Sequence, residues 1–261
     1  MIRSNGCCRA FLGTYKREPL DAVVPQSEIG SLYDGISRFY DVWGKLTESR
    51  ARERALELAD IKDGATVLEV AVGTGLMFEQ IVRRNPGGKN IGVDLSKGML
   101  EKARRRLAKL GEKNYSLSIG DAAALEIGSD SVDVLVNNYM FDLLSFEEMD
   151  RVLAEFRRVL KPGGKMVLVN MTKGRGIGGG IYDWVYRLFP RAMGGCRGVE
   201  FSGRLGRLGF RVERREFVRQ MLFPSEVILA RKVLLQNYSE GMEMAFSGNF
   251  YAAIGNRSSM N

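Results

Sequence analysis

Hydrophobic runs of strand length alternate with amphipathic helical stretches through the middle of this chain, and this alternation restricts the possible folds most. Five such runs lie at residues 67–72, 91–94, 115–119, 132–137 and 165–170. Helical patterns separate them at residues 76–84, 97–110 and 146–160. Strands that alternate with helices predict βαβ units and a mostly parallel sheet. We therefore expect an α/β fold with a doubly wound sheet.

Local signals at the ends of these segments support the prediction. The helix over 146–160 is preceded by Ser145 with Glu148 three residues later, which is the pattern of a capping box. Residues 161–164, with the sequence Lys-Pro-Gly-Gly, cannot continue that helix. Two further candidate strands, at 210–216 and 226–231, bring the predicted sheet to seven strands.

The remaining segments suggest how the chain is organised around one domain over residues 28–232. Residues 1–27 resemble a loosely ordered arm, and 28–60 predict one or two helices that cover the core at 61–170. An insertion at 171–205 begins rich in glycine and continues with an aromatic amphipathic stretch. Residues 233–261 show no clear period, so we predict a tail without defining its structure.

Composition excludes several classes of protein. The chain has no histidine, which rules out Ser-His-Asp catalysis and any imidazole base. Its three cysteines lack metal-site spacing, so no metal site is expected. No stretch approaches the roughly 18 apolar residues of a membrane-spanning helix, and residues 1–19 lack the apolar core of a secretory signal, which together predict a cytoplasmic protein.

The net charge of +8 is compatible with an anionic partner, including peripheral contact with an anionic membrane. The cations, however, are spread along helices, as at 102–109, where a solvated face is the simpler interpretation. No clear nucleic-acid signature is present, and the sequence leaves the oligomeric state open.

The strongest local motif is a buried strand that runs into a glycine turn and then a helix, over residues 67–75. Glycines at such a turn let the backbone approach a ligand, and the helix start presents unpaired N–H groups. Asp94 ends the next strand, near the offset at which an acidic side chain binds the ribose of an adenosine ligand. Phe78 stands at the third glycine position of a dinucleotide motif, which argues against a nicotinamide-dependent dehydrogenase.

Several motifs that occur in order along the chain indicate a protein family. The turn at 69–75 reads Glu-x-Ala-x-Gly-Thr-Gly, and matching segments follow at 92–96, 120–122, 130–133 and 160–164, with paired tyrosine-aspartate elements at 33–34 and 40–41. Together they resemble the class I S-adenosylmethionine-dependent methyltransferases, in the ubiquinone/menaquinone-biosynthesis-like (methyltransferase type 11) branch. The chain departs from the commoner motif by carrying Ala71 where many members have glycine.

The resemblance implies S-adenosyl-L-methionine as cofactor in a Rossmann-like fold. It places Glu69 toward the methionine ammonium, Asp94 on the ribose hydroxyls and Met99 on the adenine face. The complete set of implied cofactor-binding residues is Glu69, Ala71, Gly73, Gly75, Asp94, Leu95, Met99, Asp121, Ala122 and Asn137. Some of these residues could instead have a purely structural role: Met99 suits a core position, and Asp121 suits a turn.

The acceptor side is less defined. Asp142, Tyr139 and Tyr40 are the candidate catalytic residues by topology, with ordinary loop and helix polarity as the alternative. Tyr33, Trp184, Tyr186 and Arg197 are candidate substrate contacts, although the aromatic stretch at 181–189 also suits a helix packed on the sheet. We predict methyl transfer to a small or amphipathic acceptor that is quinol-, lipid-, thiol- or amine-like. The alternative is a catalytically silent protein that binds S-adenosylmethionine or S-adenosylhomocysteine.

Overall fold

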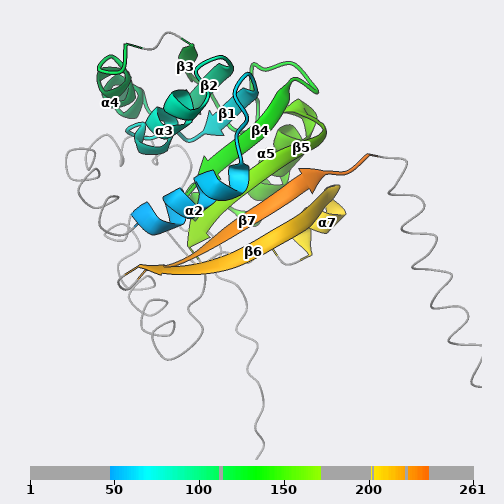
Figure 1. Ribbon diagram of the computed structural model, residues 1–261. Coiled ribbons are helices and arrows are strands. Elements are labelled where there is room, and N and C mark those ends of the chain that lie inside the picture. Colours follow the sequence, from blue (N-terminus) through cyan, green and yellow to red (C-terminus); the bar gives the residue numbers. More distant parts are fainter. Residues whose placement is uncertain (1–47, 112–113, 172–200, 202, 221–222, 235–261) are drawn as a thin grey trace, which may run out of the picture.

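The structure is a computed structural model, and it describes residues 48–111, 114–171, 201, 203–220 and 223–234 (Figure 1). A seven-stranded sheet forms its centre, with the strand order β3-β2-β1-β4-β5-β7-β6. The strands are β1 Thr66–Val70, β2 Lys89–Asp94, β3 Tyr115–Ile119, β4 Val132–Asn138, β5 Leu160–Met171, β6 Phe210–Gln220 and β7 Phe223–Lys232. Strands β1 to β5 pair in parallel, and β7 runs antiparallel to both β5 and β6. The predicted doubly wound, mostly parallel seven-stranded sheet is confirmed.

Helices cover both faces of this sheet (Figure 1). Helices α2 (Ser49–Ala59), α3 (Leu76–Arg84) and α4 (Lys97–Leu107) pack on one face, while α5 (Phe146–Val159) and α7 (Arg204–Arg207) pack on the other. Alternation along the strands divides the core accordingly. In β4, Val134 and Val136 face the first set of helices, whereas Leu135 faces α5.

The start of β5 differs from the expected turn followed by a strand. The capping box between Ser145 and Glu148 is present, and α5 ends at Val159. Leu160 then already pairs with Val132, and the next pair joins Lys165 to Val134. Residues 161–164 therefore form a bulge opposite a single residue of β4, because proline and two glycines cannot keep the ladder regular.

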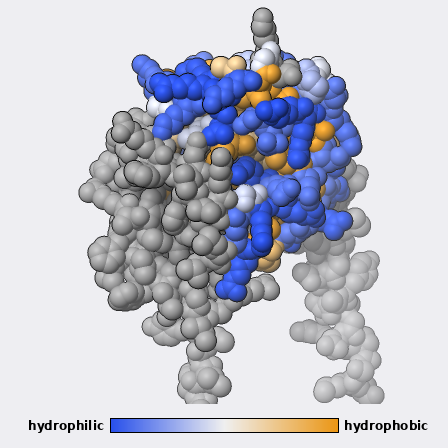
Figure 2. All heavy atoms as spheres, turned by 60° about the vertical axis from the view of Figure 1, so that its left-hand side comes forward, coloured by the Kyte–Doolittle hydropathy of each residue, from blue (hydrophilic) through white to orange (hydrophobic). Residues whose placement is uncertain are grey.

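The surface of the described residues is largely hydrophilic. On α4, Arg104 and Arg105 are exposed while Met99, Leu100 and Ala103 are buried, as an amphipathic helix requires. Figure 2 shows mostly hydrophilic side chains with scattered apolar spots on the face that it presents. Within the described ranges, no helix has the length and apolar character needed to span a membrane.

The order of the strands locates the ligand edge. From the central β1 the chain builds outward to β2 and β3 on one side, and then to β4 and β5 on the other. In open α/β sheets, ligands bind beyond the carboxyl ends of the strands at such a reversal. The loops after β1, β2 and β4 meet there.

Candidate active site

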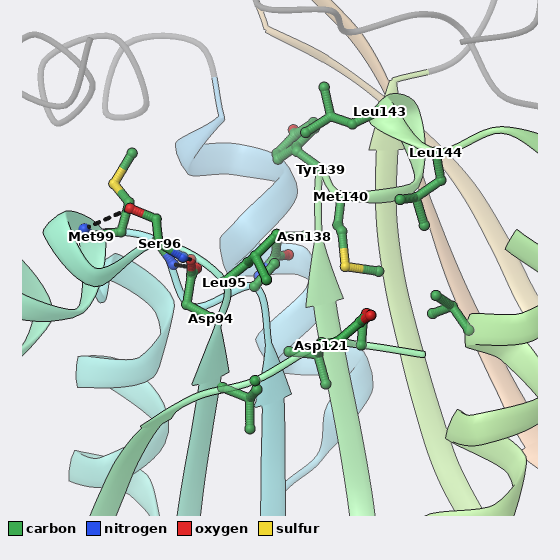
Figure 3. Close-up of a pocket in the computed structure, with 17 residues that line it drawn as sticks. Asp94, Leu95, Ser96, Met99, Asp121, Asn138, Tyr139, Met140, Leu143 and Leu144 are labelled. Atoms are coloured by element: carbon green, nitrogen blue, oxygen red, sulfur yellow. Dashed lines mark hydrogen bonds between the residues drawn. The ribbon is translucent and has the colours of Figure 1, made fainter. Parts of the chain in front are cut away.

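An open cleft lies at the carboxyl ends of β1, β2 and β4 and encloses about 830 Å³ of space, including its mouth (Figure 3). Asp94, Ser96 and Met99 lie on one side, and Tyr139, Met140 and Leu143 lie on the other (Figure 3). The remaining lining residues are Val70, Ala71, Gly73, Val93, Leu95, Gly120, Asp121, Ala122, Asn138, Leu144 and Val152. The cleft therefore combines a polar side with an apolar one.

The turn after β1 forms the floor of the cleft in a left-handed backbone conformation. Ala71, Gly73 and Gly75 have φ angles of 62°, 57° and 81°. A Cβ added to Gly73 would meet no atom within 4 Å, so this glycine leaves open space beside the cleft. Gly75 does not line the cleft. A Cβ added to Gly75 would lie 3.0 Å from Ala103 Cβ, so the lack of a side chain here lets α3 pack closely on α4.

Asp94 connects this turn to the end of β2. Its carboxylate accepts hydrogen bonds from the backbone N–H of Gly73 at 2.7 Å and of Ser96 at 2.8 Å. The next residue, Leu95, lines the cleft with 46% of its surface exposed. An apolar side chain left exposed at the edge of a cleft is suited to cover the flat face of a ligand.

The wall formed after β2 and β3 contains three more of the predicted residues. Met99 is 2% exposed, and its N–H donates to the Ser96 hydroxyl, which caps α4. Asp121 lines the cleft while its Oδ1 accepts from Ala123 N–H at 2.9 Å, so it forms a turn and also presents a carboxylate. Ala122 lies beside it in the lining.

At the end of β4, the cleft is lined by Asn138 and not by the predicted Asn137. Asn137 is completely buried, and its amide donates to Val70 O at 2.8 Å. Successive side chains of a strand point to opposite faces, so only one of the two asparagines can face the pocket. The register of β4 places Asn138 there, and Asn137 instead ties β4 to β1.

A second pocket, here called the α2 pocket, adjoins the cleft through four residues that line both: Ala71, Gly73, Asn138 and Tyr139. Glu48, Arg52 and Glu69 are its charged lining residues. The Asn138 amide donates to Glu69 Oε1 at 3.4 Å, while Glu69 Oε2 has no hydrogen-bond partner in the described part of the chain. Glu69 is 1% exposed, and this burial raises its pKa well above the usual value.

Glu48 also lies in the α2 pocket. Burial raises its pKa to about 7, against the opposing effect of the nearby Arg52 charge. Two carboxyl groups whose pKa is raised by burial therefore stand where a cationic group would find acceptors.

The two described catalytic candidates are held by other groups. The Tyr139 hydroxyl lies 2.7 Å from Ser225 Oγ, and burial raises its pKa, followed by the charge of Glu48. Asp142 is fully buried and accepts from Met171 N–H at 3.1 and 3.0 Å through its two oxygens. Tyr139 lines the cleft and Asp142 does not, so the structure brings only one of the two to the cleft.

The other predicted contacts, Tyr33, Tyr40, Trp184, Tyr186 and Arg197, lie outside the described residues. Several lining residues were missed from the sequence: Glu48, Arg52, Ser96, Asn138, Met140, Leu143 and Leu144. Ser96 had a usable signal, because it stands where a helix N-cap is expected. The contributions of α2 depend on how that helix packs on the sheet, which a local pattern does not encode.

Comparison with known proteins gives a consistent picture. Residues 67–164 match a family described as a methyltransferase domain. The chain is 28% identical to a demethylmenaquinone methyltransferase of Thermus thermophilus, over 88% of this chain and 99% of that protein. It is also 28% identical to a demethylmenaquinone methyltransferase of Thermotoga maritima, over 86% and 92% of the two chains.

Solved structures share the fold at low identity. One is a methyltransferase from Aquifex aeolicus that depends on S-adenosylmethionine, with a TM-score of 0.55 and 22% identity over 80% of this chain and all of that one. Another is the [4+2]-cyclase SpnF, with a TM-score of 0.68 and 19% identity over 82% and 98% of the two chains. The fold alone therefore does not fix the reaction. The matched methyltransferase domain and the curated relatives identify this chain as an S-adenosylmethionine-dependent methyltransferase, and its sequence is similar to proteins of the ubiquinone/menaquinone-biosynthesis type.

Proposed function

We propose that this methyltransferase transfers the methyl group to a carbon of a quinol-like acceptor. Two relatives that match nearly their whole length are named demethylmenaquinone methyltransferases. The observation that carries the proposal is the apolar side of the cleft, where Met140, Leu143 and Leu144 follow Asn138 and lie across from Asp94 (Figure 3). Such a wall suits a flat aromatic ring with few polar atoms.

The described residues fit S-adenosylmethionine in a defined order. Glu69 offers an unpartnered buried oxygen for the ammonium group, and Gly73 leaves open space beside it. We assign the ribose to Asp94, the adenine faces to Leu95 and Met99, and the adenine edge to Asp121 and Ala122. Each of these last five residues lines the cleft.

Bound S-adenosylmethionine supplies a methyl group that is already activated by its sulfonium. The protein then has to align the acceptor and exclude water, and such positioning supplies about 7–11 kcal/mol. Tyr139 is suited to orient an acceptor oxygen: its raised pKa keeps the phenol protonated, so it can donate or accept a hydrogen bond but does not serve readily as a base. Asp142 would act indirectly, by holding the end of β5 through Met171.

The test is methyl transfer by the purified full chain to a reduced demethylnaphthoquinone with a short prenyl tail. We expect a product heavier by one CH₂ unit, together with stoichiometric release of S-adenosylhomocysteine. Thiol, amine and phospholipid-headgroup acceptors in parallel reactions separate the other acceptor classes. Tight binding of S-adenosylhomocysteine without methylation of any acceptor would favour the silent cofactor-binding protein instead.

A further inference from the structure

The α2 pocket contains a guanidinium that the cofactor assignments above do not use. Arg52 lies on α2, is partly buried and lines this pocket together with Glu69. Within the described ranges, Arg52 forms no ion pair with a carboxylate. Its charge nevertheless acts on the pocket, because it opposes the burial that raises the pKa of Glu48 and of Glu69.

Helix α2 is fixed by contacts that leave Arg52 directed at the pocket. Arg54 forms two hydrogen bonds with Glu216 of β6, at 2.6 and 2.8 Å. At the helix start, Arg50 N–H donates to Gln220 of the same strand at 2.8 Å. Ala51, Ala55 and Ala59 are buried against the sheet. The far edge of the sheet thus sets the position of α2, which packs mainly on β5, β7 and β6 (Figure 1).

Arg52 and Glu69 therefore line one pocket, and neither the guanidinium nor Glu69 Oε2 has a hydrogen-bond partner in the described part of the chain. Removing a polar or charged group from water is unfavourable unless it finds a partner. Both Arg52 and the orphan oxygen of Glu69 carry part of this cost in the protein without ligand. A ligand that brings one cation and one anion on adjacent atoms would relieve both.

The methionine end of the cofactor has that charge pattern, with an ammonium and a carboxylate on the same carbon. A guanidinium binds a carboxylate through two parallel N–H donors, which gives strength and orientation. We propose that Arg52 binds the carboxylate of S-adenosylmethionine while Glu69 accepts from its ammonium. This inference rests on the cofactor site described above and assigns it a new residue. It also predicts that the protein binds adenosine ligands with an intact amino acid end more tightly than ligands that lack its carboxylate.

The test compares three ligands that differ only in this end, by calorimetry on the full chain. S-adenosylhomocysteine carries both charged groups, S-adenosyl-3-thiopropylamine lacks the carboxylate, and 5′-methylthioadenosine lacks both. We expect Arg52→Ala to weaken S-adenosylhomocysteine binding by about ten- to a hundredfold, the range of a charge-assisted hydrogen-bonded pair. The same variant should leave the affinity for the other two ligands within about twofold. Arg52→Lys should lose an intermediate amount, because it keeps the charge without the fork.

Arg50→Ala is the matched control, because it removes the same charge from an exposed position of the same helix and keeps the backbone bond to Gln220. It should change none of the three affinities by more than about twofold. Equal losses for all three ligands in Arg52→Ala would refute the carboxylate contact and indicate a displaced helix. An unchanged affinity for S-adenosylhomocysteine would refute it as well. If the unaltered chain bound none of the ligands, the cofactor site itself would be wrong.

Discussion

Replacing Ala71 by glycine should stabilise this protein, contrary to the usual effect of that substitution. Ala71 has a φ of 62°, in the left-handed region, at the turn after β1. A residue with a Cβ costs about 1–2 kcal/mol there. Glycine escapes this cost but loses about 0.5–1 kcal/mol more backbone entropy on folding. The difference gives a net gain of roughly 0–1.5 kcal/mol, with a central value of about 0.75 kcal/mol.

Urea denaturation measures this gain as a higher midpoint with an unchanged slope, since the surface exposed on unfolding stays the same. Ala108→Gly is the control, because Ala108 is exposed and has an ordinary helical φ of −56°. It should destabilise the protein by about 0.4–1 kcal/mol, because glycine gives the unfolded chain more backbone freedom to lose. If both variants lower the free energy of unfolding equally, the left-handed strain assigned to Ala71 does not exist. Binding of S-adenosylhomocysteine should survive in both variants.

Three further outcomes follow from the site. Asp94→Ala should weaken S-adenosylhomocysteine binding in calorimetry by about 1.5–3 kcal/mol, because it removes a charged acceptor of the ribose hydroxyls; unchanged affinity would disprove the ribose assignment. Affinity for the same ligand should rise with pH above the usual carboxyl range, because burial raises the pKa of Glu69 in the free protein while a bound ammonium favours its ionised form. Glu69→Gln should weaken binding and remove its part of the slope, and Glu48→Gln separates the contribution of the other carboxyl group. Gly92→Ala should lower the free energy of unfolding by about 1–3 kcal/mol, since the added Cβ would lie 2.5 Å from Leu117 Cδ2 and 2.9 Å from Val72 Cγ2, and a normal melting temperature would contradict this packing.

Local patterns predicted the parts of the fold that local interactions determine. The predicted segments 76–84 and 115–119 coincide with α3 and β3, and the capping box before α5 forms as expected. In contrast, β6 was predicted only to residue 216, whereas it continues to Gln220. Its arginines and glutamates lack an alternating apolar pattern, and pairing with β7 defines its length instead.

The site shows the same division between local and long-range information. Ala71, Gly73, Asp94 and Met99 reach the cleft because they follow directly from strand ends and a helix start. The choice between Asn137 and Asn138 depends on the register of β4 against β1, and the choice of Arg52 depends on contacts between α2 and β6 across more than 160 positions of sequence. Neither is visible in a short window of residues.

Asp94 shows why a carboxylate suits the end of β2 better than an amide. Its oxygens already accept from two backbone N–H groups, one in the turn after β1 and one at the start of α4. An ionised carboxylate has about four acceptor positions, so binding ribose hydroxyls does not require these backbone bonds to break. An asparagine at this position would direct its NH₂ group at one of the two backbone N–H groups. Two hydrogen-bond donors would then face each other, which would loosen the turn. Because the carboxylate joins the glycine turn to α4 before any ligand arrives, the ribose position is built into the folded protein, and little ordering cost remains for the cofactor to offset.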